Sequence, residues 1–302
     1  MNKRSGVNFH IHSKDGSDGL LTRVEFCRLA ERHNVKYIAF TDHNYIPSDE
    51  ELQLLKNQFK TLQIIRGCEF STVAELDEHR FEAHVIGLNF TPSQEMKELV
   101  SANTLPEALQ REYINQLISS VQAAGLNCSV TYDTLKQYYP ERRIISRSHL
   151  ADALLIENKK LKSRKEVFDF YIGDRMPNTM RKANYIPKPL VYPSLARIVE
   201  LVHNCGGTAI LCHPFGYRLS DENVTKLISM FAAIGKRTGG RTAVEVFYAR
   251  YGDSIQSSLK CRADQADPPL LYSAGTDFHS LEDKVCTCYD PKIAYDLLGI
   301  ER

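Results

Sequence analysis

Residues 35–43 read VKYIAFTDH, an apolar run typical of a buried strand that is followed at once by polar residues able to bind metals. The same arrangement recurs at residues 7–12, 208–213 and 270–279, and segments with helical periodicity lie between these runs. Strands that alternate with helices predict an α/β fold with a parallel sheet. The seven predicted strands cover residues 7–11, 35–40, 63–65, 83–88, 208–212, 243–247 and 270–274. Because polar residues follow these strands, we expect a barrel whose site lies at the carboxyl ends of the strands.

Signals for helix ends fit this alternation. Thr22, with Glu25 three residues later, forms a capping-box pattern at the start of a helix. Residues 50–59 predict a second helix. Pro193 is expected in the first turn of another helix, which the glycines at 206–207 would end.

The pattern changes after about residue 94. Residues 95–185 are predicted to be mostly helical and are rich in Lys and Arg, and the strand–helix alternation then resumes. We therefore expect the barrel to be formed by residues 1–94 and 186–302, with residues 95–185 as an inserted helical subdomain.

The composition is that of a soluble globular protein, with 302 residues, 43% hydrophobic and 25% charged. A net charge of +1 gives no global attraction to nucleic acids or membranes, so we expect no membrane association and no stable binding of double-stranded DNA. No apolar run approaches the roughly 18 residues of a membrane span, and the first residues lack the apolar segment of a secretion signal. The eight cysteines are scattered, which favours reduced thiols without a chemical role and a cytoplasmic location.

Histidines and carboxylates gather beside the predicted strands. They are His10, His12, His43, His84, His213 and His279, together with Asp18, Glu69 and Asp277. His10 and His12 are two residues apart on a strand, so their side chains leave from one face. Taken alone, this pair could be a solvent-facing strand, Asp18 a turn residue and His84 a hydrogen-bonded core histidine. The repetition favours metal coordination, because so many imidazoles would be costly to bury without partners.

These residues occur in motifs that match a known family in order and over the whole chain. The motifs are HIHS (10–13), SDG (17–19), TDHN (41–44), GCEFS (67–71), AHVIGL (83–88), CHP (212–214) and TDFHS (276–280). With them the chain resembles the PHP (polymerase and histidinol phosphatase) family. The resemblance implies a distorted (β/α)7 barrel with a trinuclear metal centre that hydrolyses phosphate esters. Carried over to this chain, it implies one metal held by His10, His12, Glu69 and Asp277, a second by Glu69, His84 and His213, and a third by Asp18, His43 and His279.

The predicted insertion resembles one branch of that family, which contains 3′,5′-nucleotide phosphatases and 5′-to-3′ exoribonucleases of the RNase AM type. The matching segments are RSHLA (147–151), FDFYIG (168–173) and YIPK (185–188). The resemblance implies that the insertion caps the substrate and that Arg147 and His149 bind its phosphate. The planar donors of an Arg suit phosphate oxygens, although Arg147 could also be a solvated cation at a helix end. Ser148 stands where proline is usual in that branch.

We therefore predict a metal-dependent phosphoesterase with three divalent ions per chain (manganese, iron or zinc) and a hydroxide held by the metals as nucleophile. The expected substrates are a 3′,5′-bisphosphate nucleotide, a 5′-phosphorylated nucleotide or a short single-stranded RNA. The alternatives are a phosphatase for phosphorylated small molecules such as histidinol phosphate, and a non-catalytic PHP module that binds metal. Amidohydrolases also begin with an HxH motif, but in them Asp18, His43 and His279 would have no function. The native metal and the oligomeric state stay open.

Overall fold

The chain forms two compact units in a computed structural model that describes residues 5–77, 79–102, 106–139, 145–173 and 178–301. Unit 1 combines residues 1–103 with 192–302, and unit 2 is the continuous segment 104–191. The first boundary lies later than expected from the sequence, because helix α3 (Gln94–Ala102) packs Met96 and Val100 into the core of unit 1, and the second lies at 191–192 instead of 185–186.

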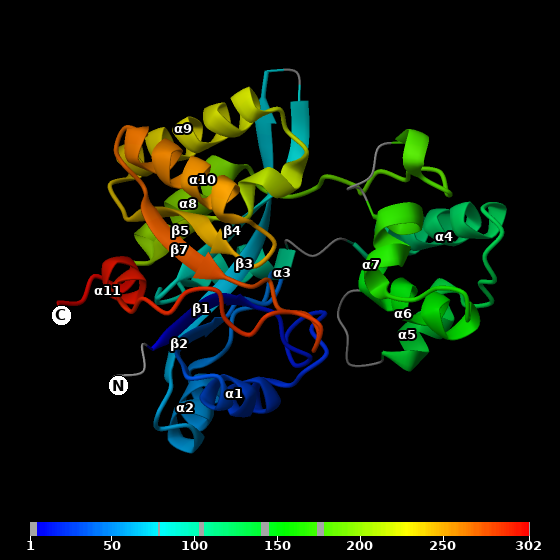
Figure 1. Ribbon diagram of the computed structural model, residues 1–302, viewed down its shortest axis with the longest axis horizontal. Helices are drawn as coiled ribbons and strands as arrows, with labels where there is room; N and C mark the ends of the chain where they lie inside the picture. Colours follow the sequence, from blue (N-terminus) through cyan, green and yellow to red (C-terminus); the bar gives the residue numbers. More distant parts are fainter. Residues whose placement is uncertain (1–4, 78, 103–105, 140–144, 174–177, 302) are drawn as a thin grey trace. The chain divides into compact units, whose positions relative to one another are not determined.

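Unit 1 is built on a seven-stranded sheet whose strands follow one another in sequence order (Figure 1). The strands are β1 (Gly6–Ile11), β2 (Val35–Phe40), β3 (Gln63–Leu76), β4 (His79–Leu88), β5 (Thr208–Leu211), β6 (Thr242–Tyr248) and β7 (Leu271–Gly275). The first strand also meets the segment that follows the last one, through a bridge between Ile11 and Phe278. The buried Asn8 side chain strengthens this junction by donating to Thr276 Oγ1 at 2.8 Å. The sheet is therefore a nearly closed barrel, and the predicted distorted (β/α)7 fold is confirmed.

One strand departs from the predicted parallel sheet. β4 runs antiparallel to both β3 and β5, whereas all other neighbouring strands are parallel. The reason is the connection: only residues 77–78 separate β3 from β4, and a parallel pair needs a crossover of about a dozen residues or more. β3 also continues to Leu76 instead of ending at Ile65, because it pairs with β4 along its length. This pairing places His84 opposite Ser71, close to Glu69.

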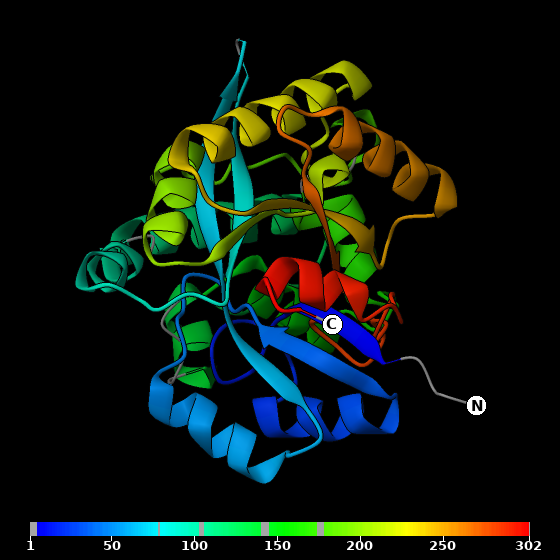
Figure 2. The same cartoon turned by 90° about the vertical axis from the view of Figure 1, so that its left-hand side faces the viewer.

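Helices cover the strands of unit 1 on opposite sides, with α1 and α2 on one side and α9 and α10 on the other (Figures 1 and 2). The helices besides α3 are α1 (Arg23–Arg32), α2 (Asp49–Gln58), α8 (Leu195–Asn204), α9 (Asp221–Thr238), α10 (Asp253–Gln265) and α11 (Lys292–Leu298). The predicted capping box of Thr22 and Glu25 is confirmed. Pro193 lies outside α8, however, because Ser194 is the N-cap of that helix.

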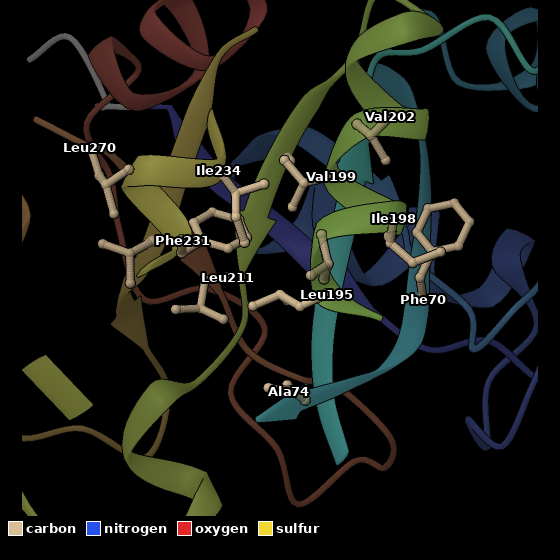
Figure 3. Close-up of a cluster of buried hydrophobic side chains, with 14 of the residues drawn as sticks. Phe70, Ala74, Leu195, Ile198, Val199, Val202, Leu211, Phe231, Ile234 and Leu270 are labelled. Atoms are coloured by element: carbon tan, nitrogen blue, oxygen red, sulfur yellow. The ribbon is translucent and has the colours of Figure 1, made fainter. Parts of the chain in front are cut away.

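The largest core of unit 1 lies between the sheet and helices α8 and α9. Leu195, Ile198, Val199 and Val202 of α8 face residues of β3 and β5, such as Phe70 (Figure 3). Burial of each such side chain contributes about 1.5–3 kcal/mol to the stability of the fold. This packing therefore stabilises the position of the strands that carry the polar site.

Unit 2 has a hydrophobic core of its own, and its described residues form helices and loops. The helices are α4 (Glu107–Ala123), α5 (Tyr132–Tyr138), α6 (Arg147–Glu157) and α7 (Arg164–Val167), followed by a π-helical turn (Phe168–Ile172) and a 3-10 turn (Asn178–Met180). Ile114, Leu135, Leu150 and Leu154 are completely buried in this core. In the described parts of both units, no helix is long and apolar enough to span a bilayer.

Candidate metal centre

The centre of the site is the carboxylate of Glu69, which is 1% exposed and faces five histidines. Its Oε1 atom lies 3.2 Å from His10 Nε2, 3.0 Å from His84 Nδ1 and 3.6 Å from His213 Nε2. Its Oε2 atom lies 3.2 Å from His12 Nε2 and 3.0 Å from His43 Nδ1. The two oxygens of one carboxylate thus face two different sets of imidazoles, so Glu69 would be able to bind two cations, one through each oxygen.

Two further carboxylates extend this cluster. Asp277 Oδ1, just after β7, lies 3.2 Å from His12 Nε2, 3.5 Å from His10 Nε2 and 3.4 Å from His279 Nδ1. Asp18 Oδ1 lies 3.4 Å from His279 Nε2 and 3.8 Å from His12 Nδ1. Imidazoles and carboxylates therefore alternate across the site.

All nine ligands expected from the sequence belong to groups whose coordinating atoms lie within 4.8 Å of one another. The groups are His12, Asp18, His43 and His279; His10, Glu69 and His213; His10, His12 and Asp277; and His43, Glu69 and His84. These sets overlap strongly with the three that the family resemblance implies. The groups also share residues, so several ions could be held close together.

The donor set fits divalent cations. Among the described residues, His10 Nε2, His12 Nε2, His43 Nδ1, His84 Nδ1 and both Glu69 oxygens are buried without a well-formed hydrogen bond. Such atoms are costly to bury, and coordination of a cation would satisfy all of them at once. Mixed nitrogen and oxygen ligands suit zinc, manganese and iron.

The pKa values show that the buried carboxylates stabilise positive charge on several neighbouring groups. Burial would raise the pKa of Glu69, but the surrounding His84, His10 and His43 hold it well below its usual range. Burial would lower the pKa of His12, but Asp277 and Glu69 raise it to about 10. Without metals, His10, His12 and His84, whose pKa values are raised, thus take up protons as counter-charge of the carboxylates, whereas burial lowers the pKa of His43. Cations bound here would compete with those protons.

Three residues to which the sequence assigned no role support the candidate ligands. Glu245 Oε1 lies 2.9 Å from His10 Nδ1, and the Tyr248 hydroxyl donates to Asp277 Oδ2 at 2.8 Å. Asp42 accepts hydrogen bonds from the Ser13 backbone N–H at 2.6 Å and from the Ser17 hydroxyl at 2.9 Å, which fixes the loop that carries Asp18. In the sequence, the only local signal for Asp42 is its position directly before the candidate ligand His43. Glu245 and Tyr248 have no such signal, because β6, the strand that carries them, ends in no metal-binding motif.

The backbone is unusual where two candidate ligands leave the strands. His213 and Asp277 have φ angles of +27° and +52°, in a region that residues other than glycine rarely adopt. Such conformations cost on the order of 1–3 kcal/mol each and cluster at functional sites. The barrel therefore stores strain at the place where the polar side chains converge.

Arg147 and His149 lie in unit 2, in the first turn of α6. His149 is 5% exposed, and its Nδ1 accepts a hydrogen bond from the Ser146 backbone N–H at 2.9 Å. The ring centroid of His149 lies 4.4 Å from that of Tyr139, and the Arg147 guanidinium lies 6.0 Å from the Phe168 ring centroid. Because Nδ1 accepts, a neutral His149 carries its proton on Nε2. The assignment of both residues to phosphate binding stays a prediction.

The chain matches a family model described as the PHP domain over residues 8–173, which is more than half of its length. This segment includes six of the nine candidate ligands, and His213, Asp277 and His279 lie beyond it. The 5′-3′ exoribonuclease Rnm of Escherichia coli (strain K12) is 27% identical over 279 residues, covering 90% of this chain and 85% of that protein. A 5′-3′ exoribonuclease of Haemophilus influenzae is 27% identical over 273 residues, covering 90% of this chain and 89% of that protein.

Two solved structures share the fold. An amidohydrolase from Chromobacterium violaceum, determined with bound sulfate and no metal, has a TM-score of 0.71 at 23% identity and covers 97% of each chain. A putative metal-dependent phosphoesterase from Bifidobacterium adolescentis has a TM-score of 0.71 at 21% identity, covering 98% of this chain and 96% of that one. At these identities the likeness concerns the fold alone.

Proposed function

The chain belongs to the PHP domain family and is a hydrolase, and on this premise we propose that it hydrolyses phosphate esters of 5′-phosphorylated RNA with the help of three divalent cations. The exoribonucleases of E. coli and H. influenzae, which align with 90% of this chain, favour RNA over a mononucleotide or another phosphorylated small molecule.

The observation that carries the proposal is the position of Glu69. Its two buried oxygens face different histidines, and no well-formed hydrogen bond to a described residue satisfies either oxygen. A carboxylate in this position would bridge two cations by binding one through each oxygen. In the proposed assignment, His10, His12 and Asp277 complete one cation site with Glu69. The other two sites use Glu69 with His84 and His213, and Asp18 with His43 and His279.

Divalent cations at these positions would polarise a phosphoryl oxygen and lower the pKa of a nearby water to about 7. The chain's own residues supply the geometry for this chemistry. Glu69 and Asp277 fix the spacing of the imidazoles, and their negative charge selects for cations. The attack of water on phosphorus forms one P–O bond and breaks another, and the departing oxygen takes up the proton that the attacking water loses.

We assign Arg147 and His149 to the phosphate of the substrate. An Arg donates two parallel hydrogen bonds to phosphate oxygens, which favours it over a Lys for this purpose. With its Nδ1 occupied by the Ser146 N–H, His149 would present Nε2–H to an oxygen of the substrate. Unit 2 would then serve as the part of the chain that recognises the substrate.

The test is an assay of purified, manganese-loaded protein on a short RNA with a 5′-phosphate and on the same RNA with a 5′-hydroxyl. Adenosine 3′,5′-bisphosphate, 5′-AMP and histidinol phosphate complete the panel. We expect mononucleotides to appear from the 5′ end of the phosphorylated RNA first. The Glu69→Gln variant, which keeps the size of the side chain, serves as the inactive control.

Each alternative predicts a different result. Release of phosphate from the bisphosphate or 5′-AMP, with intact RNA, would indicate a nucleotide phosphatase. Activity on histidinol phosphate alone would contradict a role of unit 2 in nucleotide recognition. Retention of metal without turnover of any ester would indicate a metal-binding module that is not an enzyme.

A further inference from the structure

Strand β6 supplies none of the nine candidate ligands, yet it carries two buried polar side chains that contact them. Glu245, which is 1% exposed, lies 2.9 Å from His10 Nδ1 through its Oε1. Tyr248, which is 3% exposed, donates its hydroxyl hydrogen to Asp277 Oδ2 at 2.8 Å. We propose that β6 is a positioning strand, in which Glu245 sets the tautomer and orientation of His10 and Tyr248 orients Asp277 for metal binding. This inference rests on the proposed function only in taking His10 and Asp277 as ligands.

The contacts of Glu245 determine which nitrogen of His10 carries the hydrogen. Glu245 Oε2 accepts the backbone N–H of His213 at 2.9 Å, so the carboxylate is anchored to the main chain. An ionised carboxylate can only accept, and a neutral His10 must therefore donate from Nδ1 to Oε1. The lone pair of His10 is then on Nε2, the atom that faces Glu69 Oε1 at 3.2 Å. A carboxylate behind a metal-binding histidine also increases the basicity of the imidazole.

A bulge in β6 allows two residues of that strand to serve the same site. Glu245 and Tyr248 are three positions apart, and regular alternation would direct their side chains to opposite faces of the sheet. The register between β6 and β7 shifts between Glu245 and Phe247, so one additional residue is inserted there. This shift brings both side chains to the same face, and bulges are common beside active sites for this reason.

The neighbouring strand leaves room for the pair of Glu245 and His10. A Cβ atom on Gly275 of β7 would overlap both Glu245 Oε1 and the His10 Cβ. Any larger residue at position 275 would separate the carboxylate from the imidazole. The tight fit and the bulge therefore support the same conclusion, because both serve to hold Glu245 against His10.

The test compares Glu245→Gln with Glu75→Gln, which removes the same charge from an exposed position on β3. The amide has one acceptor oxygen, so either the His213 N–H or the His10 Nδ1–H loses its acceptor, or His10 adopts the tautomer with its proton on Nε2. We expect the affinity for Mn²⁺ to fall about 10- to 100-fold in Glu245→Gln, the range for outer partners of metal ligands, and to stay unchanged in Glu75→Gln. Free Mn²⁺ is counted by electron paramagnetic resonance, and the absorption spectrum of bound Co²⁺ reports the change at the histidine.

A second variant keeps the test decisive if Glu245→Gln does not fold. Tyr248→Phe removes only the hydroxyl group, and we expect Mn²⁺ affinity to fall about 10- to 100-fold, because one hydrogen bond to a charged ligand is lost. Wild-type affinity and an unchanged Co²⁺ spectrum in the folded variants would overturn the proposal. A purely structural role would instead lower the urea midpoint equally with and without metal. If the wild-type protein binds Mn²⁺ but cleaves no phosphate ester, the proposed function is wrong. The role of β6 would still be tested in that case by the effect of Glu245→Gln on Mn²⁺ affinity.

Discussion

Units 1 and 2 hold their candidate functional residues by different means. In unit 1, Glu69 meets histidines from segments as distant as His10 and His213, so each side chain depends on contacts across the whole barrel. In unit 2, His149 is held by Ser146, only three residues earlier, at the start of one helix. Loss of one member of a long-range network of charges is expected to disturb metal binding at the whole site. Loss of a local helix cap is expected to affect only one helical turn.

The largest effect is expected from Glu69→Gln. A neutral amide would replace the carboxylate that faces both sets of imidazoles, and the remaining ligands could no longer share their cations. We expect turnover to fall by more than about 100-fold, beyond the range for outer partners of metal ligands, together with loss of bound metal. Metal content by mass spectrometry and RNA hydrolysis measure both. Glu75→Gln on the same strand should behave as wild type, and full metal content in Glu69→Gln would contradict the bridging role.

Arg147→Ala should separate substrate binding from metal binding. A hydrogen bond to a charged group contributes about 1.5–3 kcal/mol, so we expect the KM for phosphorylated RNA to rise by about 10- to 100-fold. Metal content should not change, because the candidate ligands all belong to unit 1. Steady-state kinetics of the variant are compared with Lys159→Ala, which alters an exposed cation of unit 2. An unchanged KM in Arg147→Ala would remove Arg147 from the site.

The metal-free protein should lose stability as the pH rises. Burial lowers the pKa values of His12 and His84, but neighbouring carboxylates overcome this and raise them to about 10 and about 9. Because these values exceed the unfolded value of 6.5, the stabilisation is complete below about pH 6.5 and is lost as the pH rises through about 9 to 10. Glu69 has a lowered pKa, so its contribution persists above its unfolded value and is lost only in acid.

Urea unfolding of the metal-free protein at pH 6 and at about pH 10 measures this change, and the midpoint should be lower at the higher pH. Metal binding at neutral pH should also release protons, because the cations displace them from His12 and His84. Calorimetry in two buffers of different ionisation enthalpy counts those protons. Metal binding without proton release would show that these imidazoles are neutral before the cations arrive.

The smallest effect is expected from Ser146→Ala. The variant removes the N-cap of α6, which contributes about 1 kcal/mol, and loosens the turn that carries His149. Hydrogen exchange should become faster in the first turn of α6, while the strands of unit 1 and the metal content should not change. Faster exchange throughout β1 and β3 would contradict an effect confined to the first turn of α6.

Much of the barrel and of the candidate site could be predicted because the signals are local. The strand that ends at Phe40 and the cap of Thr22 depend on neighbours within a few residues. The direction of β4 was not predicted, since alternating strands and helices suggested a parallel sheet throughout. Glu245 received no role for a different reason: a Glu inside a strand has no local signal for a partner that lies 235 positions away.

The amino-acid pattern alone was enough to predict which segments form strands, which residue types follow them and which of those could bind cations. It could do so because hydrophobic periodicity, capping and ligand chemistry are properties of short segments. Three features became visible only in the folded chain: Glu69 lies between two sets of histidines, β4 returns antiparallel and brings His84 beside them, and a bulge directs Glu245 and Tyr248 to one face. These features depend on closure of the barrel, which brings β1 against β7 and so fixes distances between residues that the chain order keeps far apart.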